Sequence, residues 1–496
     1  MQRKIAAIAV MAIVGTVACG EEDAKKMPFT VSKETTRITE PLRADGKVDY
    51  VKALNERYGK GVKAEENAFV GYLEIVGTEA LNPRICKEVL WRCSGAETPK
   101  DAVLWESDRR FSFAGNMEEA TGREELCRAM ESPWNAEKSP EVADYLAKRE
   151  KLLDAAVVVA ERERWWLPSV ASGEPEMISV LLPRLAPVRE LVEGLCARAM
   201  LRANSSDFNG FMTDVIAAKR LARHVGSGAT LIERLIGIAS NAQVNITIGG
   251  AVGSGTWNPE QCGKLGAAIR ELPPISTPAD AIDTCERWCI LDTVVYMSQQ
   301  KYGEAGTVMK LFEANAFFNA IDQNAMNYDR VLKMVNELYD DFLAATREPT
   351  IAQVETKFAA IRERIETWNR ESKNGGTLRR QANETEAEYT ERIGRAIVAF
   401  LAPVLERAEP LYRRNCQEEA MLEVLLAAAA YRGKTGNWPA ELKVLLPEYL
   451  NAVPKDAFSE NGATDVEYVR TERGVMLRSA AWKVDGAEYR IELGAK

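Results

Sequence analysis

The sequence predicts a mainly α-helical protein, with an irregular helical body followed by a small C-terminal α+β module. Apolar residues recur at helical spacing from about residue 47 to 434. No repeat of fixed period is present in the sequence, which argues against a regular solenoid. Near the C-terminus the pattern changes to three short β-type runs separated by turn residues.

The first 18 residues, MQRKIAAIAVMAIVGTVA, have the features of a bacterial export signal. Arg3 and Lys4 precede an apolar run that is too short to cross a bilayer. The string GTVAC, which ends at Cys19, resembles the lipobox of bacterial lipoproteins, although Thr16 stands where leucine is usual. The resemblance implies cleavage before Cys19 and a diacylglycerol on its sulfur. The alternative is an ordinary secretory signal followed by a coincidental cysteine.

The lipobox resemblance places the protein in the bacterial cell envelope, anchored to a membrane by its N-terminal lipid and facing the periplasm or the cell surface. Residues 19–46 are polar and contain Pro28 and Pro41, so we expect a linker there. The helical body is expected over 47–415 and the C-terminal module over 416–496.

Several helices are expected in the body. The ranges are 141–164, 188–203, 208–224, 277–301 and 349–371. Thr230 with Glu233, and Thr385 with Glu388, have the spacing of a capping box, so a helix is expected to begin at each threonine. The first of these helices should end at Gly249 and Gly250. Their apolar stripes, and that of a third helix, are Leu231, Leu235, Ile238, Ala242 and Ile246; Ile393, Ile397, Leu401 and Val404; and Val331, Val335, Leu338 and Phe342.

The expected C-terminal module consists of a helix over 417–433, a loop, and a three-stranded antiparallel meander over 466–471, 475–482 and 487–493. The segment resembles the C-terminal part of type II secretion pseudopilins. The matching residues are Gly436, Trp438, Pro439, Leu442, Leu445, Pro447, Tyr449, Leu450, Pro454, Asp456 and Phe458. We expect Trp438 to be buried where helix, loop and sheet meet.

The pseudopilin resemblance covers about eighty residues and concerns the fold of the module. The long apolar N-terminal helix that polymerises pseudopilins is missing, and so is their acidic, glycine-rich calcium loop. A helical body followed by such a module also resembles large families of exported bacterial lipoproteins, and this resemblance implies no activity.

Eight cysteines remain once Cys19 is assigned to the lipid. An even number in an exported chain predicts disulfides, whose pairing the sequence does not determine. Buried, unpaired thiols are the other interpretation. The spacing of Cys285 and Cys289 does not fit a zinc site, and no metal or cofactor is expected. The disulfide candidates are Cys86, Cys93, Cys127, Cys196, Cys262, Cys285, Cys289 and Cys416.

The sequence contains few candidates for catalysis. The acidic neighbours Glu65–Glu66 and Asp340–Asp341 are expected to point in different directions on solvated faces. The glycine-rich segment 249–255 follows a helix and lacks a following Gly-Lys-Ser/Thr, so we expect a connection between helices there. His224 should favour a helix C-terminus, and the pair 165–166 (Trp-Trp) should be a buried helix end, with sugar stacking as the alternative.

Charge and composition narrow the functional classes. The 496 residues include 64 Lys and Arg, 73 Asp and Glu, and a single His, for a net charge of −9. Nucleic acid is therefore not an expected partner, and histidine-based catalysis is disfavoured. We expect an envelope protein that binds or scaffolds a protein partner without catalysis. The alternatives are an envelope hydrolase using acidic residues and an accessory protein of a secretion or pilus-like machine.

Overall fold

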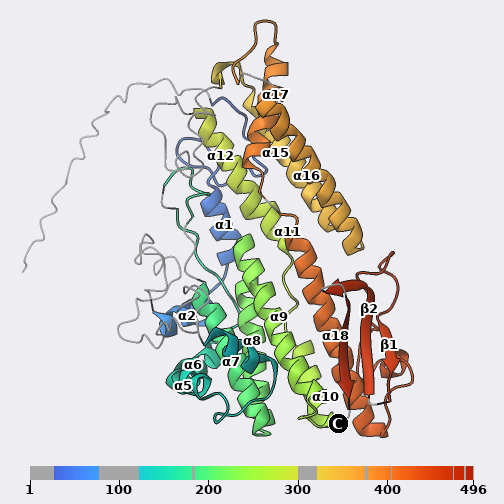
Figure 1. The fold of residues 1–496 in the computed structure, drawn as a ribbon. Helices are drawn as coiled ribbons and strands as arrows, with labels where there is room; N and C mark the ends of the chain where they lie inside the picture. The colour runs from blue at the N-terminus through green and yellow to red at the C-terminus, as the bar shows by residue number, and fades with distance from the viewer. Residues whose placement is uncertain are drawn as a thin grey trace, which may run out of the picture.

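The computed structural model describes residues 27–77, 122–171, 173–180, 185–299, 321–374, 378–403, 405–472, 474–484 and 487–494. This part of the chain is mainly helical, with a small antiparallel sheet near the C-terminus, which confirms the predicted fold class in outline (Figure 1). The predicted signal segment, the lipidation site Cys19, and the disulfide candidates Cys86 and Cys93 lie outside the described residues.

The helices follow one another along the chain with short connections. They are α1 (Tyr50–Gly59), α2 (Ala68–Val76), α4 (Arg123–Glu131), α5 (Pro140–Lys148), α6 (Glu150–Ala160), α7 (Ala186–Asn204), α8 (Phe208–Gly226), α9 (Leu231–Gly253), α10 (Pro259–Arg270), α11 (Pro278–Ala281), a π-helical turn (Ile282–Glu286), α12 (Arg287–Gln299), α15 (Tyr328–Thr346), α16 (Ile351–Asn374), α17 (Glu386–Leu401) and α18 (Ala408–Thr435).

Buried apolar side chains form two clusters, and two long helices contribute to both. The first cluster lies between α2 and α4–α10, the second half of α18, and the sheet. The second lies between α1, α11–α12 and α15–α17. Helix α18 supplies Ala408 to the second cluster and Met421 to Ala429 to the first. Figure 1 shows α9 and α18 running beside each other through the middle of the molecule.

Both predicted capping boxes are confirmed, at the start of α9 and of α17. The glycine signal for the end of α9 is wrong, because the helix continues through Gly249 and Gly250 to Gly253. A Cβ on Gly250 would lie 1.9 Å from the carbonyl oxygen of Glu131. Glycine is therefore needed there for close contact with the end of α4, and it does not stop the helix.

The single helix expected over 141–164 is wrong in detail, because it is divided into α5 and α6 at Arg149. Arg149 has φ −108° and ψ 7°, outside the helical region. Its guanidinium lies over the ring of Tyr145, with 4.1 Å from Cζ to the centroid. Apolar periodicity continues on both sides of the break, which explains why the sequence pattern predicts one helix.

The linker expected before the body is wrong from residue 27 onward, because this segment packs against α15. The backbone N–H of Thr30 donates to Asp329 Oδ1 at 2.6 Å. Asn336 Nδ2 donates to the carbonyl oxygens of Glu34 and Thr35, each at 2.9 Å. Phe29 is buried in the second cluster. Polar composition therefore reflects hydrogen bonding to the body in this segment and does not indicate a free tether.

The C-terminal sheet consists of β1 (Glu467–Arg470), β2 (Gly474–Val484) and β3 (Ala487–Gly494). Strand β2 pairs antiparallel with both of the others, and the β2–β3 register shifts between Ser479 and Lys483. The apolar side of the sheet joins the first cluster through Val475 and Leu477. The expected domain boundary at 415/416 falls inside α18, which is continuous through this point.

The expected burial of Trp438 is wrong, because its side chain is only half-buried. The indole packs under Arg432, whose Cζ lies 4.7 Å from the ring centroid. Pro439 is the buried member of this turn, and Tyr468 Oη donates to its carbonyl oxygen at 2.8 Å. The turn between α18 and the sheet is therefore held mainly by Pro439 and this hydrogen bond.

Helix α9 is the one helix in the described ranges that is long and apolar enough to cross a membrane by these measures. More than half of its apolar window is buried inside the protein. The residues that it buries include Glu233, Arg234, Asn241 and Asn245. A core helix of a folded body has these properties, so the hydropathy of α9 is weak evidence for a membrane span.

Candidate functional site

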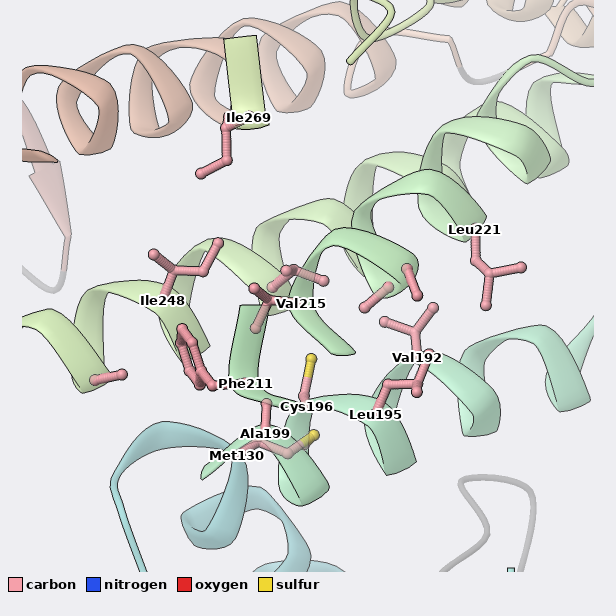
Figure 2. Close-up of a cluster of buried hydrophobic side chains, with 14 of the residues drawn as sticks. Met130, Val192, Leu195, Cys196, Ala199, Phe211, Val215, Leu221, Ile248 and Ile269 are labelled. Carbon is pink, nitrogen blue, oxygen red and sulfur yellow. The ribbon is translucent and has the colours of Figure 1, made fainter. Parts of the chain in front are cut away.

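The described cysteines do not support the expected disulfides. All six of them are free: Cys127, Cys196, Cys262, Cys285, Cys289 and Cys416. Cys196 lies among apolar side chains of α7 and α8 (Figure 2), and burial raises its pKa to about 12. Cys285 and Cys289 are one turn apart on a helix, where Cβ atoms are about 5–6 Å apart, whereas a disulfide needs about 3.5–4.5 Å.

The acidic neighbours have separate partners. Asp340 pairs with Arg287 at 2.7 Å and Asp341 with Arg364 at 2.5 Å. Glu66 pairs with Lys63 at 3.1 Å. The prediction that Asp340 and Asp341 do not act on one substrate atom therefore agrees with the structure.

The tryptophan pair follows α6 and its members differ in environment. Trp165 is 6% exposed, and its ring packs edge-on against Phe69 at a centroid distance of 5.4 Å. Its Nε1 lies 3.5 Å from Glu233 Oε1. Trp166 is half-buried beside Gly59, where an added Cβ would lie 2.4 Å from the indole. The burial expected for the pair is therefore confirmed for Trp165 only.

His224 lies in the last turn of α8, and its environment differs from the one expected. Burial lowers its pKa, and the nearby charge of Arg220 lowers it further. Its Nε2 is 3.2 Å from the carbonyl oxygen of Ala160, and its ring stacks on Trp165 at 6.4 Å and 16°. The imidazole is therefore neutral near pH 7, so the expected interaction of a charged histidine with the helix dipole is wrong.

A buried polar network joins α8, α9 and α18 at the centre of the molecule. Lys219 is completely buried, and its Nζ lies 3.0 Å from Glu419 Oε2. It also donates to Asn245 Oδ1 at 2.7 Å and to Asn241 Oδ1 at 3.2 Å. Arg223 Nη2 forms a second ion pair with Glu419. One carboxylate thus faces two buried cations.

Burial and charge oppose each other in this network. Burial lowers the pKa of Lys219, while Glu419 acts in the opposite direction. Burial alone would raise the pKa of Glu419, but Lys219 and Arg223 outweigh it and hold the pKa below its usual value. Glu419 is therefore ionised near pH 7, and its charge stabilises both cations.

Arg223 has hydrogen-bonding capacity that the described protein does not use. The residue is 7% exposed. Its Nε and Nη1 are buried, and neither has a hydrogen-bond partner among the described residues. Leaving a buried polar group without a partner costs about 1–3 kcal/mol, and more for a charged one. An arrangement of this kind is expected where a bound acceptor completes the site.

The first cavity beside Arg223, the arginine pocket, has a volume of about 510 Å³. The C-terminal end of α8, the segment after α6, the end of α1 and the loop after α10 surround it. This volume is in the usual range for a small-molecule site. Its charged lining consists of Arg57, Arg162, Arg164, Arg220, Arg223, Glu161 and Glu163.

The second cavity beside Arg223, the glutamate pocket, has a volume of about 480 Å³. Glu419 and Glu423 of α18 face it together with Arg223 and Arg270. Burial raises the pKa of Glu423, and the charge of Glu419 raises it further. The two carboxyl groups that line this pocket therefore have pKa values shifted in opposite directions.

No family model matches this chain, and neither does any curated protein or solved structure compared with it. The candidate site therefore depends on the geometry alone. His224 and Trp165 were candidates from the sequence, and the structure brings both to the wall of the arginine pocket. Sequence reasoning missed Arg220, Arg223 and Lys219. The available signal was a run of basic residues on a helix whose other positions are apolar.

Proposed function

We propose that this chain is a lipid-anchored binding protein of the bacterial cell envelope, acting without catalysis and holding its ligand in the arginine pocket. The observation that supports it most is Arg223, a nearly buried arginine at the wall of a cavity with two N–H groups that lack partners in the described protein. A protein partner that inserts a side chain or a chain end into this cavity would fit the same site.

Two further observations support binding over chemistry at this pocket. The imidazole of His224 is neutral, but its Nε2 is already within hydrogen-bond distance of a backbone carbonyl. Burial raises the pKa of the Cys196, Cys262 and Cys416 thiols to about 11–12, so these groups are protonated and poor nucleophiles. The groups left facing the cavity are mainly cations, which bind and orient ligands.

Binding can be tested with purified chain beginning at residue 20, by thermal shift against a panel of neutral, cationic and anionic small molecules and short peptides. We expect at least one ligand to raise the melting temperature and to be recovered unchanged. Ser276→Trp, which places an indole in the pocket from the loop after α10, should abolish the shift. Conversion of the ligand, or a shift that survives Ser276→Trp, would contradict the proposal.

The anchoring part of the proposal is tested separately in cells. Labelling with a fatty-acid analogue should mark the wild-type protein, and Cys19→Ser should lose the label and leave the membrane fraction. Equal labelling of both proteins would exclude the lipidation at Cys19.

One observation favours the alternative, an envelope hydrolase using acidic residues. Glu419 and Glu423 line the same cavity, and their pKa values are shifted apart, as in many acid–base pairs. If this were the function, Glu423→Gln would abolish hydrolysis of a glycan substrate while leaving folding intact. Glu419, however, is already paired with two cations, which favours a structural role for it.

The C-terminal module is proposed to have the pseudopilin-like arrangement, in which a three-stranded meander covers the apolar face of α18. Contacts of α18 with β2 and β3 support this proposal. It concerns fold alone and adds no activity.

A further inference from the structure

The arginines of the arginine pocket fall into two groups. Arg57 pairs with Asp280 at 2.5 Å, and Arg162 pairs with Glu74 at 2.7 Å. Arg164 and Arg220 form no ion pair within the described residues, and Arg223 shares Glu419 with Lys219. The pocket thus concentrates uncompensated positive charge.

Arg220 and Arg223 are the central pair of this cavity. They lie three residues apart on α8, so their side chains leave the helix on the same side. Like charges at this spacing destabilise a helix unless an anion lies between or beside them. Both line the arginine pocket, and Arg223 contributes buried N–H groups without partners among the described residues.

The surroundings of the pocket strengthen the contrast. Its lining contains five arginines against two glutamates, both of them exposed, whereas the whole chain has a net charge of −9. A positive cavity in an acidic protein attracts small anions over the negative charge elsewhere on the surface. The neighbouring glutamate pocket is balanced, with Arg223 and Arg270 against Glu419 and Glu423, so the anion belongs on the arginine side.

The remaining wall is apolar. Trp165, Pro273 and Pro274 line the same cavity. A bare inorganic ion would leave most of the volume of about 510 Å³ unfilled. The cavity therefore suits a molecule with a charged group at one end and a compact apolar body at the other.

We infer that the arginine pocket binds an organic oxyanion, a carboxylate or phosphate group on a compact apolar body, with the charged group between Arg220 and Arg223. This inference rests on the proposed binding function and names the ligand chemistry of the same pocket. The guanidinium groups supply the charge-assisted hydrogen bonds, and Trp165 with the two prolines supplies the apolar contact.

Four probes test the inference by isothermal titration calorimetry at low ionic strength: phenyl phosphate, phenylacetate, 2-phenylethanol and inorganic phosphate. We expect at least one of the two aromatic anions to bind at least tenfold more tightly than 2-phenylethanol and inorganic phosphate, and its affinity to fall as salt is added. Comparison of phenyl phosphate with phenylacetate distinguishes a phosphate from a carboxylate as the preferred group.

Variants then assign the binding to the arginine pair. Arg220→Gln should weaken the aromatic anions by about tenfold, which corresponds to about 1.4 kcal/mol. Arg470→Gln is the matched control, because Arg470 is exposed on β1 and forms no ion pair in the described part of the chain. Arg223→Lys keeps the charge but removes the fork of N–H groups, so it should weaken binding at unchanged melting temperature.

The two proposals can fail separately. If 2-phenylethanol binds as tightly as both aromatic anions, or Arg220→Gln leaves their affinity unchanged, the anion inference is wrong. If a neutral ligand binds in a way that Ser276→Trp abolishes, the proposed binding function stands without the anion inference. If inorganic phosphate binds as tightly as phenyl phosphate, the apolar part of the inference is wrong.

Discussion

Two helix interfaces of this protein are built on opposite principles. Where α9 meets α8 and α18, the centre is polar: Lys219 is completely buried and Glu419 is 9% exposed. Where α15 meets α17, the centre is apolar, with Val335 and Ile397 both fully buried, and an ion pair between Arg330 and Glu391 lies at the half-exposed edge. The apolar interface needs only area and fit, whereas the polar one requires every member to be present.

The largest expected effect is in the polar interface. Glu419→Ala removes the carboxylate that faces Lys219 and Arg223, leaving two buried cations without it. Removing one partner of a buried ion pair costs about 3–5 kcal/mol. Urea unfolding followed by circular dichroism should show this loss. Glu448→Ala, which breaks the exposed pair with Lys434, is the control and should change the stability by less than about 1 kcal/mol. A loss for Glu419→Ala as small as that of the control would show that the network does not contribute to stability.

The corresponding variant in the apolar interface is Ile397→Ala. Its side chain is fully buried, so truncation leaves a cavity and should cost about 2–4 kcal/mol. The loss should be the same at low and high salt, because no charge is involved, whereas the loss for Glu419→Ala should depend on pH. A strong salt dependence of the Ile397→Ala effect would contradict this distinction between the two interfaces.

A smaller effect is expected at Glu418, the neighbour of Glu419 on α18. Burial raises the pKa of Glu418 to about 7. A carboxyl group with a raised folded-state pKa favours folding below its unfolded-state pKa, and this contribution is lost as pH rises through about 7. Glu418→Gln should therefore be more stable than the wild type at pH 8, by about 1–3 kcal/mol, and the difference should shrink toward pH 5. Melting curves of both proteins across this range check the sign, and a difference that grows at low pH would contradict it.

The smallest expected effect lies outside both interfaces, at Trp438. Its indole is half-buried under Arg432, so Trp438→Ala should cost about 1–2 kcal/mol, less than the loss of a core aromatic. Arg432→Ala should reproduce about half of this effect. A cost for Trp438→Ala as large as that of Glu419→Ala would show that the turn after α18 is as well packed as the core.

The two interfaces also differ in how well the sequence predicts them. The stripes of Val331, Val335 and Leu338, and of Ile393 and Ile397, identify the buried faces of α15 and α17, because burial and apolarity coincide there. On α9 they do not coincide. Ile246 belongs to the apolar stripe but is 50% exposed, whereas Asn241 is buried. Hydrophobic periodicity cannot locate a face whose burial depends on hydrogen bonds to residues from distant parts of the sequence.

The candidate site was predictable only in pieces. His224 and Trp165 were identifiable as unusual residues, and both line the arginine pocket. The role of Arg223 could not be inferred, because it depends on the pairing of Glu419 with α8 across almost two hundred residues. The local signals, in contrast, were reliable: the capping boxes at Thr230 and Thr385 involve only four consecutive residues.

The continuity of α18 has a consequence for how the protein can be divided. The helix begins in one apolar cluster and ends in the other, and its second half is buried between α10 on one side and the sheet on the other. A fragment beginning at residue 416 would carry the sheet but expose Val424, Leu425 and their neighbours to water. The C-terminal module is therefore not transplantable as a unit. In evolution it would have to be inherited together with the helices against which α18 lies.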